Sequence, residues 1–123
     1  MTVPPRVLIV EDEPLIAMML RDWVSDMGYD SIGPAHHVEA ALALLERAKP
    51  DVALLDIALG SQHCFPVADA LCARRIPFTF ASGRGGTAIP PRYESVPVLL
   101  KPFVFERVRD AIVALLNGSA RPR

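Results

Sequence analysis

This chain of 123 residues contains few cysteines and few lysines, and it has no long apolar run. Its two cysteines, Cys64 and Cys72, are too few for a disulfide scaffold and lack zinc-ligand spacing, which favours a reducing compartment. No stretch approaches the roughly 18 consecutive apolar residues of a membrane-spanning helix. Residues 1–6 lack the apolar segment of a signal peptide. We therefore expect a soluble cytoplasmic protein.

The charge balance and the length narrow the classes of protein further. A net charge of −1 gives no electrostatic reason to expect a nucleic acid or an anionic membrane as a partner. Hydrophobic residues make up 51% of the chain, which is typical of a globular protein and excludes a disordered one. We expect one domain over residues 1–123, with its core at about 6–116.

Short apolar runs alternate with amphipathic stretches along the chain. The runs have the length and composition of strands that are buried on both faces of a parallel sheet. Right-handed crossovers between them favour an α/β fold with a doubly wound five-stranded parallel sheet in the order 2-1-3-4-5. The expected strands are 7–10, 29–34, 51–55, 77–81 and 97–100, and the expected helices are 14–27, 38–48, 66–75 and 104–116.

The segment between the fourth and fifth expected strands interrupts this alternation. Residues 83–95 contain three glycines and two adjacent prolines, which disfavour a full helix. We expect one or two helical turns there, so that the helix following the fourth strand is reduced or irregular.

Four of the apolar runs end in polar residues suited to phosphate or metal chemistry. These are Glu11 with Asp12, then Asp56, Ser82 and Lys101. In an open parallel sheet, ligands bind outside the carboxyl ends of the strands, so these side chains are expected to converge on one crevice. Three carboxylates, a hydroxyl and an ammonium suit the phosphorylation of an aspartate assisted by a divalent cation.

Taken in order, four motifs carry a family resemblance. They are Val-Glu-Asp-Glu-Pro (10–14), Leu-Leu-Asp-Ile-Ala-Leu (54–59), Phe-Ala-Ser-Gly (80–83) and Leu-Lys-Pro-Phe (100–103). From about Arg6 to Leu116 the chain resembles the receiver domain of two-component response regulators, which have a flavodoxin-like fold. The Phe-Ala-Ser-Gly-Arg-Gly stretch also resembles a single-domain subgroup with the signature Phe-Ala-Thr-Gly-x-Gly.

The resemblance implies a role for each site residue. Asp56 is the expected phosphoacceptor, and Lys101 and Ser82 are expected to contact the phosphoryl group. Magnesium is the expected cofactor because this hard ion takes oxygen ligands. The expected ligands are Asp12, Asp56 and the backbone carbonyl of Ala58, with Glu11 acting mainly through water. The Lys101–Pro102 peptide is expected to be cis.

The resemblance also implies partners rather than enzymatic turnover. The expected donor is a sensor histidine kinase or a histidine phosphotransfer protein, and no output domain is expected in the chain. Many receivers carry Tyr or Phe where this chain has Val98, so their usual aromatic switch cannot operate here. Two functions therefore remain open. One is a signalling receiver read by a downstream protein, and the other is a phosphate sink without an output partner.

Other interpretations of the same residues are weaker. A flavodoxin-like mononucleotide binder would need a phosphate-cradling loop where Glu11–Glu13 stands, and these carboxylates would repel phosphate. A haloacid-dehalogenase-type phosphatase would need a second Asp at position 58, which is Ala58. His36, His37 and His63 have no acidic partner nearby in the sequence. We expect the two cysteines to be packing residues.

Overall fold

A computed structural model describes residues 3–83 and 89–118 of the chain. Its centre is a parallel sheet in the order β2-β1-β3-β6-β7, which confirms the predicted 2-1-3-4-5 topology. The sheet strands are β1 (Arg6–Val10), β2 (Asp30–Ala35), β3 (Val52–Asp56), β6 (Phe78–Ser82) and β7 (Val98–Leu100). The remaining elements are the helices α1 (Pro14–Asp26), α2 (Val38–Arg47), α3 (Phe65–Ala73) and α4 (Phe105–Leu116), the strands β4 (Ala58–Leu59) and β5 (Gln62–His63), and the 3₁₀ turn η1 (Pro91–Tyr93).

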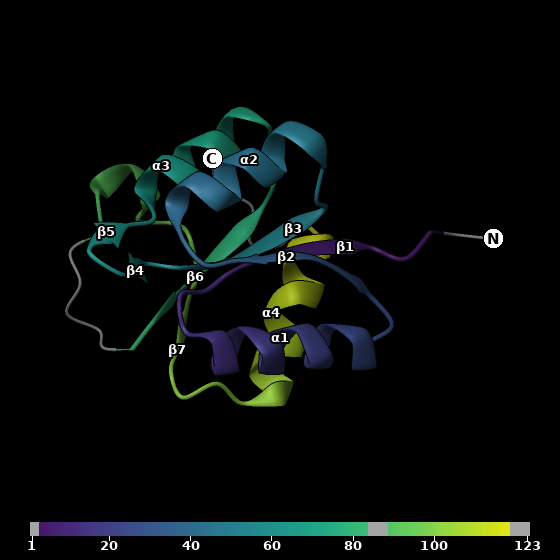
Figure 1. Cartoon of the computed structure of the whole chain (residues 1–123). Coiled ribbons are helices and arrows are strands. Elements are labelled where there is room, and N and C mark those ends of the chain that lie inside the picture. The colour runs from purple at the N-terminus through teal and green to yellow at the C-terminus, as the bar shows by residue number, and fades with distance from the viewer. Residues whose placement is uncertain (1–2, 84–88, 119–123) are drawn as a thin grey trace.

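The helices cover both faces of the sheet, with α2 and α3 on one side and α1 and α4 on the other (Figure 1). Side chains along a strand alternate between the two layers, because successive residues point to opposite faces. In β1, Leu8 and Val10 join the core under α2 and α3, whereas Val7 and Ile9 join the core under α1 and α4. This double burial explains why the strand is an unbroken apolar run.

The strand register brings the polar strand ends to one edge. Val10 lies opposite Leu55, so Glu11, which follows β1, stands level with Asp56, the last residue of β3. Asp56 in turn lies opposite Ala81, one residue before Ser82. Ser82 is paired with Leu100, one residue before Lys101.

The ends of α1 follow from the sequence. Pro14 begins the helix, where its missing N–H leaves no hydrogen bond unmade. Gly28 follows the end of the helix with a φ of +86°, a conformation that glycine adopts without strain. The polypeptide can therefore turn sharply into β2.

The structure differs from the expected elements at several places. β3 begins at Val52 and includes Asp56, so the predicted phosphoacceptor belongs to the strand and does not follow it. The short antiparallel pair β4–β5 was not predicted, because two-residue strands have no detectable periodicity. Only one turn, η1, forms in the described part of 83–95, while residues 84–88 of that predicted irregular segment lie outside the described residues.

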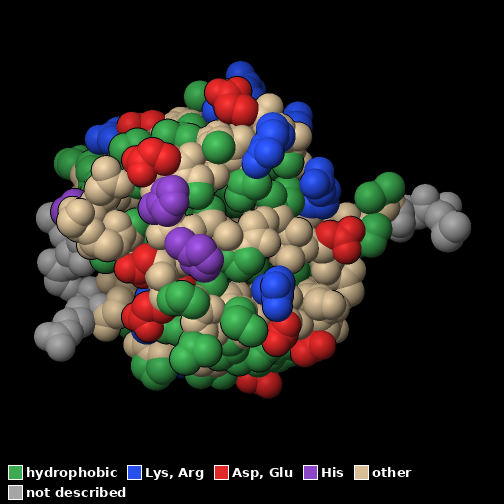
Figure 2. Space-filling view, viewed as in Figure 1, with side chains coloured by type: hydrophobic (Ala, Val, Ile, Leu, Met, Phe, Trp, Pro, Cys, Tyr) green, Lys and Arg blue, Asp and Glu red, His purple; other side chains and the backbone are tan. Residues whose placement is uncertain are grey.

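Two further properties bear on partners: the distribution of surface charge and the hydropathy of the helices. Positive and negative side chains share the face seen in Figure 2 and neither covers it, in line with the small net charge. Within residues 3–83 and 89–118, no helix has the length and hydropathy needed to cross a membrane.

Candidate functional site

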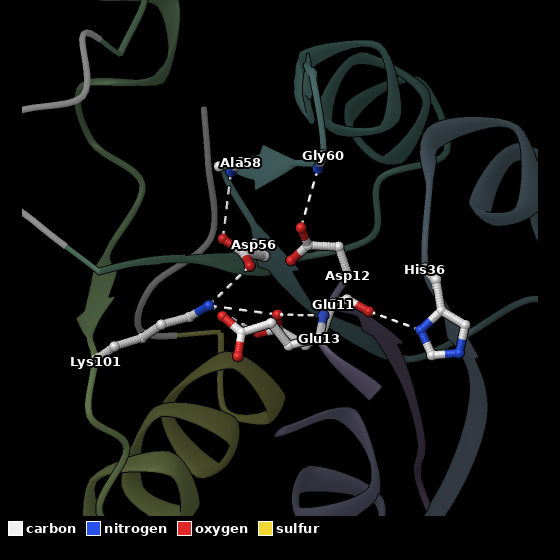
Figure 3. Close-up of polar contacts among 8 residues, drawn as sticks. All are labelled: Glu11, Asp12, Glu13, His36, Asp56, Ala58, Gly60 and Lys101. Carbon is white, nitrogen blue, oxygen red and sulfur yellow. Dashed lines mark hydrogen bonds and ion pairs between the residues drawn. The ribbon is translucent and has the colours of Figure 1, made fainter. Parts of the chain in front are cut away.

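Asp56 lies at the carboxyl end of the central strand β3, and it is 4% exposed. Its Oδ1 accepts a hydrogen bond from the backbone N–H of Ala58 at 3.3 Å. Its Oδ2 lies 2.9 Å from Nζ of Lys101 (Figure 3). A carboxylate held in this way is fixed in orientation, with its charge partly balanced.

Glu11 and Asp12 stand beside Asp56 because β1 pairs with β3. One carboxylate oxygen from each of the three residues lies within 4.8 Å of the other two. Glu11 is almost fully buried, and its Oε2 accepts a hydrogen bond from the N–H of Glu13 at 3.1 Å. Oδ2 of Asp12 accepts a hydrogen bond from the N–H of Gly60 at 3.0 Å. The sequence prediction that these three carboxylates converge is confirmed.

Lys101 enters the site from the last strand of the sheet. Its backbone N–H donates to the carbonyl of Ser82 at 2.9 Å, and its peptide bond to Pro102 is cis, as predicted. Besides Asp56, its Nζ lies 3.1 Å from Oε1 of Glu11. The ammonium therefore bridges the two most buried carboxylates of the cluster.

The clustering of charge changes the proton affinities in the site. Burial, followed by the hydrogen bond and the negative charge of Asp56, raises the pKa of Glu11 to about 7. Burial alone would lower the pKa of Lys101, but its contacts with Asp56 and Glu11 raise it overall. Burial likewise opposes the charge of Asp12, yet the hydrogen bond from Gly60 helps to lower its pKa. Burial and the neighbouring carboxylate thus favour the protonated form of Glu11.

The residues present fit a hard divalent cation. Oε1 of Glu11 is buried and accepts no hydrogen bond from the described residues, although it lies close to Lys101. Buried polar atoms are rarely left without such a partner. Carboxylate oxygens are the ligands that Mg²⁺ prefers, so the donor set matches this ion. For Ala58 the structure gives the N–H contact to Asp56, and its carbonyl stays a predicted ligand.

Two contacts in the site were missed by sequence reasoning. Gly60 reaches Asp12 from the tip of the β4–β5 hairpin, 48 residues away in the chain. Nδ1 of His36 lies 3.0 Å from the carbonyl oxygen of Glu11, which places this histidine beside β1. Neither residue belongs to a sequence pattern that could indicate these contacts.

The acidic cluster does not include the remaining histidines or the two cysteines. Nδ1 of His37 accepts a hydrogen bond from the N–H of Ala40 at the start of α2, and the ring of His63 stacks on Phe65. Cys64 is buried, as expected of a packing residue, and burial raises its thiol pKa to about 12. The expectation that Cys72 is also a packing residue is wrong, because it is exposed on α3.

Comparison with protein families identifies a model that matches most of the chain. The model of the response regulator receiver domain matches residues 7–113. Among curated proteins, the transcriptional regulatory protein PdtaR of Mycobacterium tuberculosis is 36% identical over 74 residues, which cover 60% of this chain and 36% of that protein. The phyllosphere-induced regulator PhyR of Methylorubrum extorquens is 37% identical over 129 residues, covering 96% of this chain and 46% of PhyR. The chain spans less than half the length of the curated relatives it matches.

Among solved structures, SdrG from Sphingomonas melonis Fr1 is 44% identical and superposes with a TM-score of 0.81. The match covers 94% of this chain and 99% of SdrG. A BeF₃-activated conformation of SdrG, from Pseudomonas melonis Fr1, is also 44% identical, with the same coverage and a TM-score of 0.78. This chain is thus similar over nearly its full length to a protein that BeF₃ activates.

Proposed function

Because the chain belongs to the response regulator receiver domain family, we propose that it accepts a phosphoryl group on Asp56 and signals by protein–protein contact. The proposed donor is a phosphohistidine of a sensor kinase or of a histidine phosphotransfer protein. The observation that carries the proposal is the buried Asp56 at a strand end, within reach of two further carboxylates and of Lys101.

In the proposed reaction, a carboxylate oxygen of Asp56 attacks the phosphorus atom. A P–O bond forms to the aspartate and the P–N bond of the phosphohistidine breaks, and its electron pair stays on the departing imidazole. Lys101 supplies a positive charge for a phosphoryl oxygen. Ser82 is the last residue of the neighbouring strand β6. We propose that its hydroxyl donates a hydrogen bond to the phosphoryl group.

The proposed cofactor is Mg²⁺, held by Asp12, Asp56 and the Ala58 carbonyl, with Glu11 acting through water. When bound, the ion offsets the repulsion between the carboxylates and the phosphoryl oxygens. The BeF₃-activated relative supports the phosphoacceptor assignment, because BeF₃ is a mimic of a phosphoryl group on a carboxylate.

The test is phosphorylation of the whole chain with acetyl phosphate and Mg²⁺, followed by intact mass measurement. We expect one added phosphoryl group on the wild type and none on Asp56→Asn. Asp51→Asn is the matched control, because Asp51 lies just before β3 begins, far from its Asp56 end, and accepts a hydrogen bond from the N–H of Arg6. A fully labelled Asp56→Asn chain would contradict the assignment.

The alternative function is a phosphate sink without an output partner. Val98, where many receivers have an aromatic residue, favours it, because the usual aromatic switch is missing. For the signalling function, the partner surface that we propose comprises α1 and β7, where Leu15, Met18 and Leu100 are exposed. Capture of partners by the wild type with and without BeF₃ separates the two functions. A sink would capture the same proteins in both states.

A further inference from the structure

The tip of the β4–β5 hairpin lies against the acidic cluster. The backbone N–H of Gly60 donates a hydrogen bond to Oδ2 of Asp12 at 3.0 Å (Figure 3). At the base of the same hairpin, the backbone N–H of Ala58 donates a hydrogen bond to Oδ1 of Asp56. One short hairpin thus holds two of the three carboxylates through backbone groups alone.

The turn geometry explains why the N–H of Gly60 is available. Leu59 pairs with Gln62, so Gly60 and Ser61 form a two-residue turn. Gly60 has a φ of +65°, in the left-handed region that glycine adopts without strain. A Cβ atom at this position would meet nothing within 4 Å, so the backbone conformation, and not the available space, favours glycine here. Its N–H is directed away from the hairpin and toward Asp12.

Asp12 is the cluster member with most need of such a contact. Glu11 and Asp56 are buried and contact Lys101, whereas Asp12 is only half-buried. A half-buried aspartate can turn its carboxylate toward solvent unless a donor holds it. A carboxylate offers about four acceptor positions, so one N–H on Oδ2 leaves the carboxylate further positions for a ligand.

We infer that the backbone N–H of Gly60 is a positioning group, which aims the Asp12 carboxylate at a divalent cation. The inference rests on the metal site of the proposed function. Partners that orient a metal-binding side chain typically contribute about 10–100-fold to metal affinity. The opposite mechanism, in which the N–H competes with the cation for the carboxylate, predicts that its removal tightens binding.

Two full-length semisynthetic chains separate these mechanisms. One carries D-proline in place of Gly60 and the other carries D-alanine. Both residues favour the positive φ of this turn, but only D-proline lacks the N–H. The native Cys64 provides the ligation point between a peptide of residues 1–63 and the remainder of the chain. Thermal unfolding in chelator checks that the two chains fold equally.

The measurement is the dissociation constant for Mg²⁺ by calorimetric titration. We expect the D-proline chain to bind about tenfold more weakly than the D-alanine chain, which should match the wild type. Equal or tighter binding by the D-proline chain would overturn the inference while leaving the metal site intact. A wild type that does not bind Mg²⁺ would overturn the metal site and the inference together.

Hydrogen exchange on the wild type gives a second readout that needs no variant. If the N–H of Gly60 positions Asp12, the hydrogen bond between them persists in the Mg²⁺-bound protein. Exchange of the Gly60 amide then slows on saturation with Mg²⁺. Faster exchange of the Gly60 amide with Mg²⁺ would show that the cation displaces the N–H, and the inference would then be wrong. Ala40, whose amide donates to the side chain of His37 on α2, is the reference amide.

Discussion

Nζ of Lys101 lies 2.9 Å from Oδ2 of Asp56, although 45 residues separate them in the chain. The ammonium also reaches Glu11, so a single cation balances two buried carboxylates. This arrangement leaves the cluster with excess negative charge. The stability of the fold should therefore depend on Lys101, on pH and on divalent cations, and each dependence can be measured separately.

Removing the ammonium should destabilise the metal-free protein. Lys101→Met keeps most of the side-chain volume but leaves Asp56 and Glu11 without their cation. We expect the free energy of unfolding at pH 8 in chelator to fall by about 1.5–3 kcal/mol, the range for a hydrogen bond to a charged group. Urea unfolding measures it, with the exposed Lys49→Met as the control. An unchanged free energy in Lys101→Met would show that the ion pairs contribute no net stability.

The raised pKa of Glu11 predicts how metal-free stability varies with pH. A group whose pKa is higher in the folded state binds its proton more tightly there, so it stabilises the fold below its unfolded pKa. This contribution is lost as the pH rises from about 4.3, the ordinary glutamate value, through about 7. Glu11→Gln should remove this pH-dependent contribution to the free energy of unfolding. Glu13→Gln, at an exposed position, should retain it. Urea unfolding in chelator at pH 5 and pH 8 measures the difference.

Magnesium should raise the melting temperature of the wild type. Binding to the folded state alone stabilises it by mass action, and the ion relieves the repulsion among the carboxylates. We expect millimolar Mg²⁺ to produce the shift and Asp12→Ala to abolish it. Asp22→Ala is the control because Asp22 is exposed on α1. Identical melting curves of the wild type in Mg²⁺ and in chelator would contradict the proposed metal site.

The response to a phosphoryl mimic is expected to begin at Ser82 and Gly83, because Ser82 is proposed to contact the phosphoryl group. Apolar contacts hold Tyr93, near the far end of residues 83–95. This residue is buried against Phe78 and Phe80, and its hydroxyl donates to Asp69 on α3. Amide shifts on addition of BeF₃ should therefore fade before Tyr93.

The shift pattern can also contradict this model of switching. Larger amide shifts on α4 than at Ser82 and Gly83 would contradict it, because they would place the response in the helical layer of α1 and α4. Tyr93→Phe provides a further check, because it keeps the ring packing and removes the hydrogen bond to Asp69. If Tyr93 limits the response, the shifts in this variant should extend into residues 93–96.

The sequence by itself determined the parallel sheet and the edge at which the site lies. Apolar runs such as residues 7–10 can satisfy their burial only between two helical layers, and polar residues follow them at fixed positions. Parallel strands place all of their carboxyl ends on one edge, so local patterns were sufficient to bring Glu11, Asp12 and Asp56 together.

Only the tertiary structure decided the contacts within that edge. The bridge from Lys101 to Glu11 and Asp56 depends on strand register and on side-chain reach across the sheet, which no local pattern encodes. The hydrogen bond from Gly60 to Asp12 depends on where a two-residue turn lies after folding. Propensities act over a few neighbouring residues, whereas these contacts join segments 45 or more residues apart, so they form only when the layers pack.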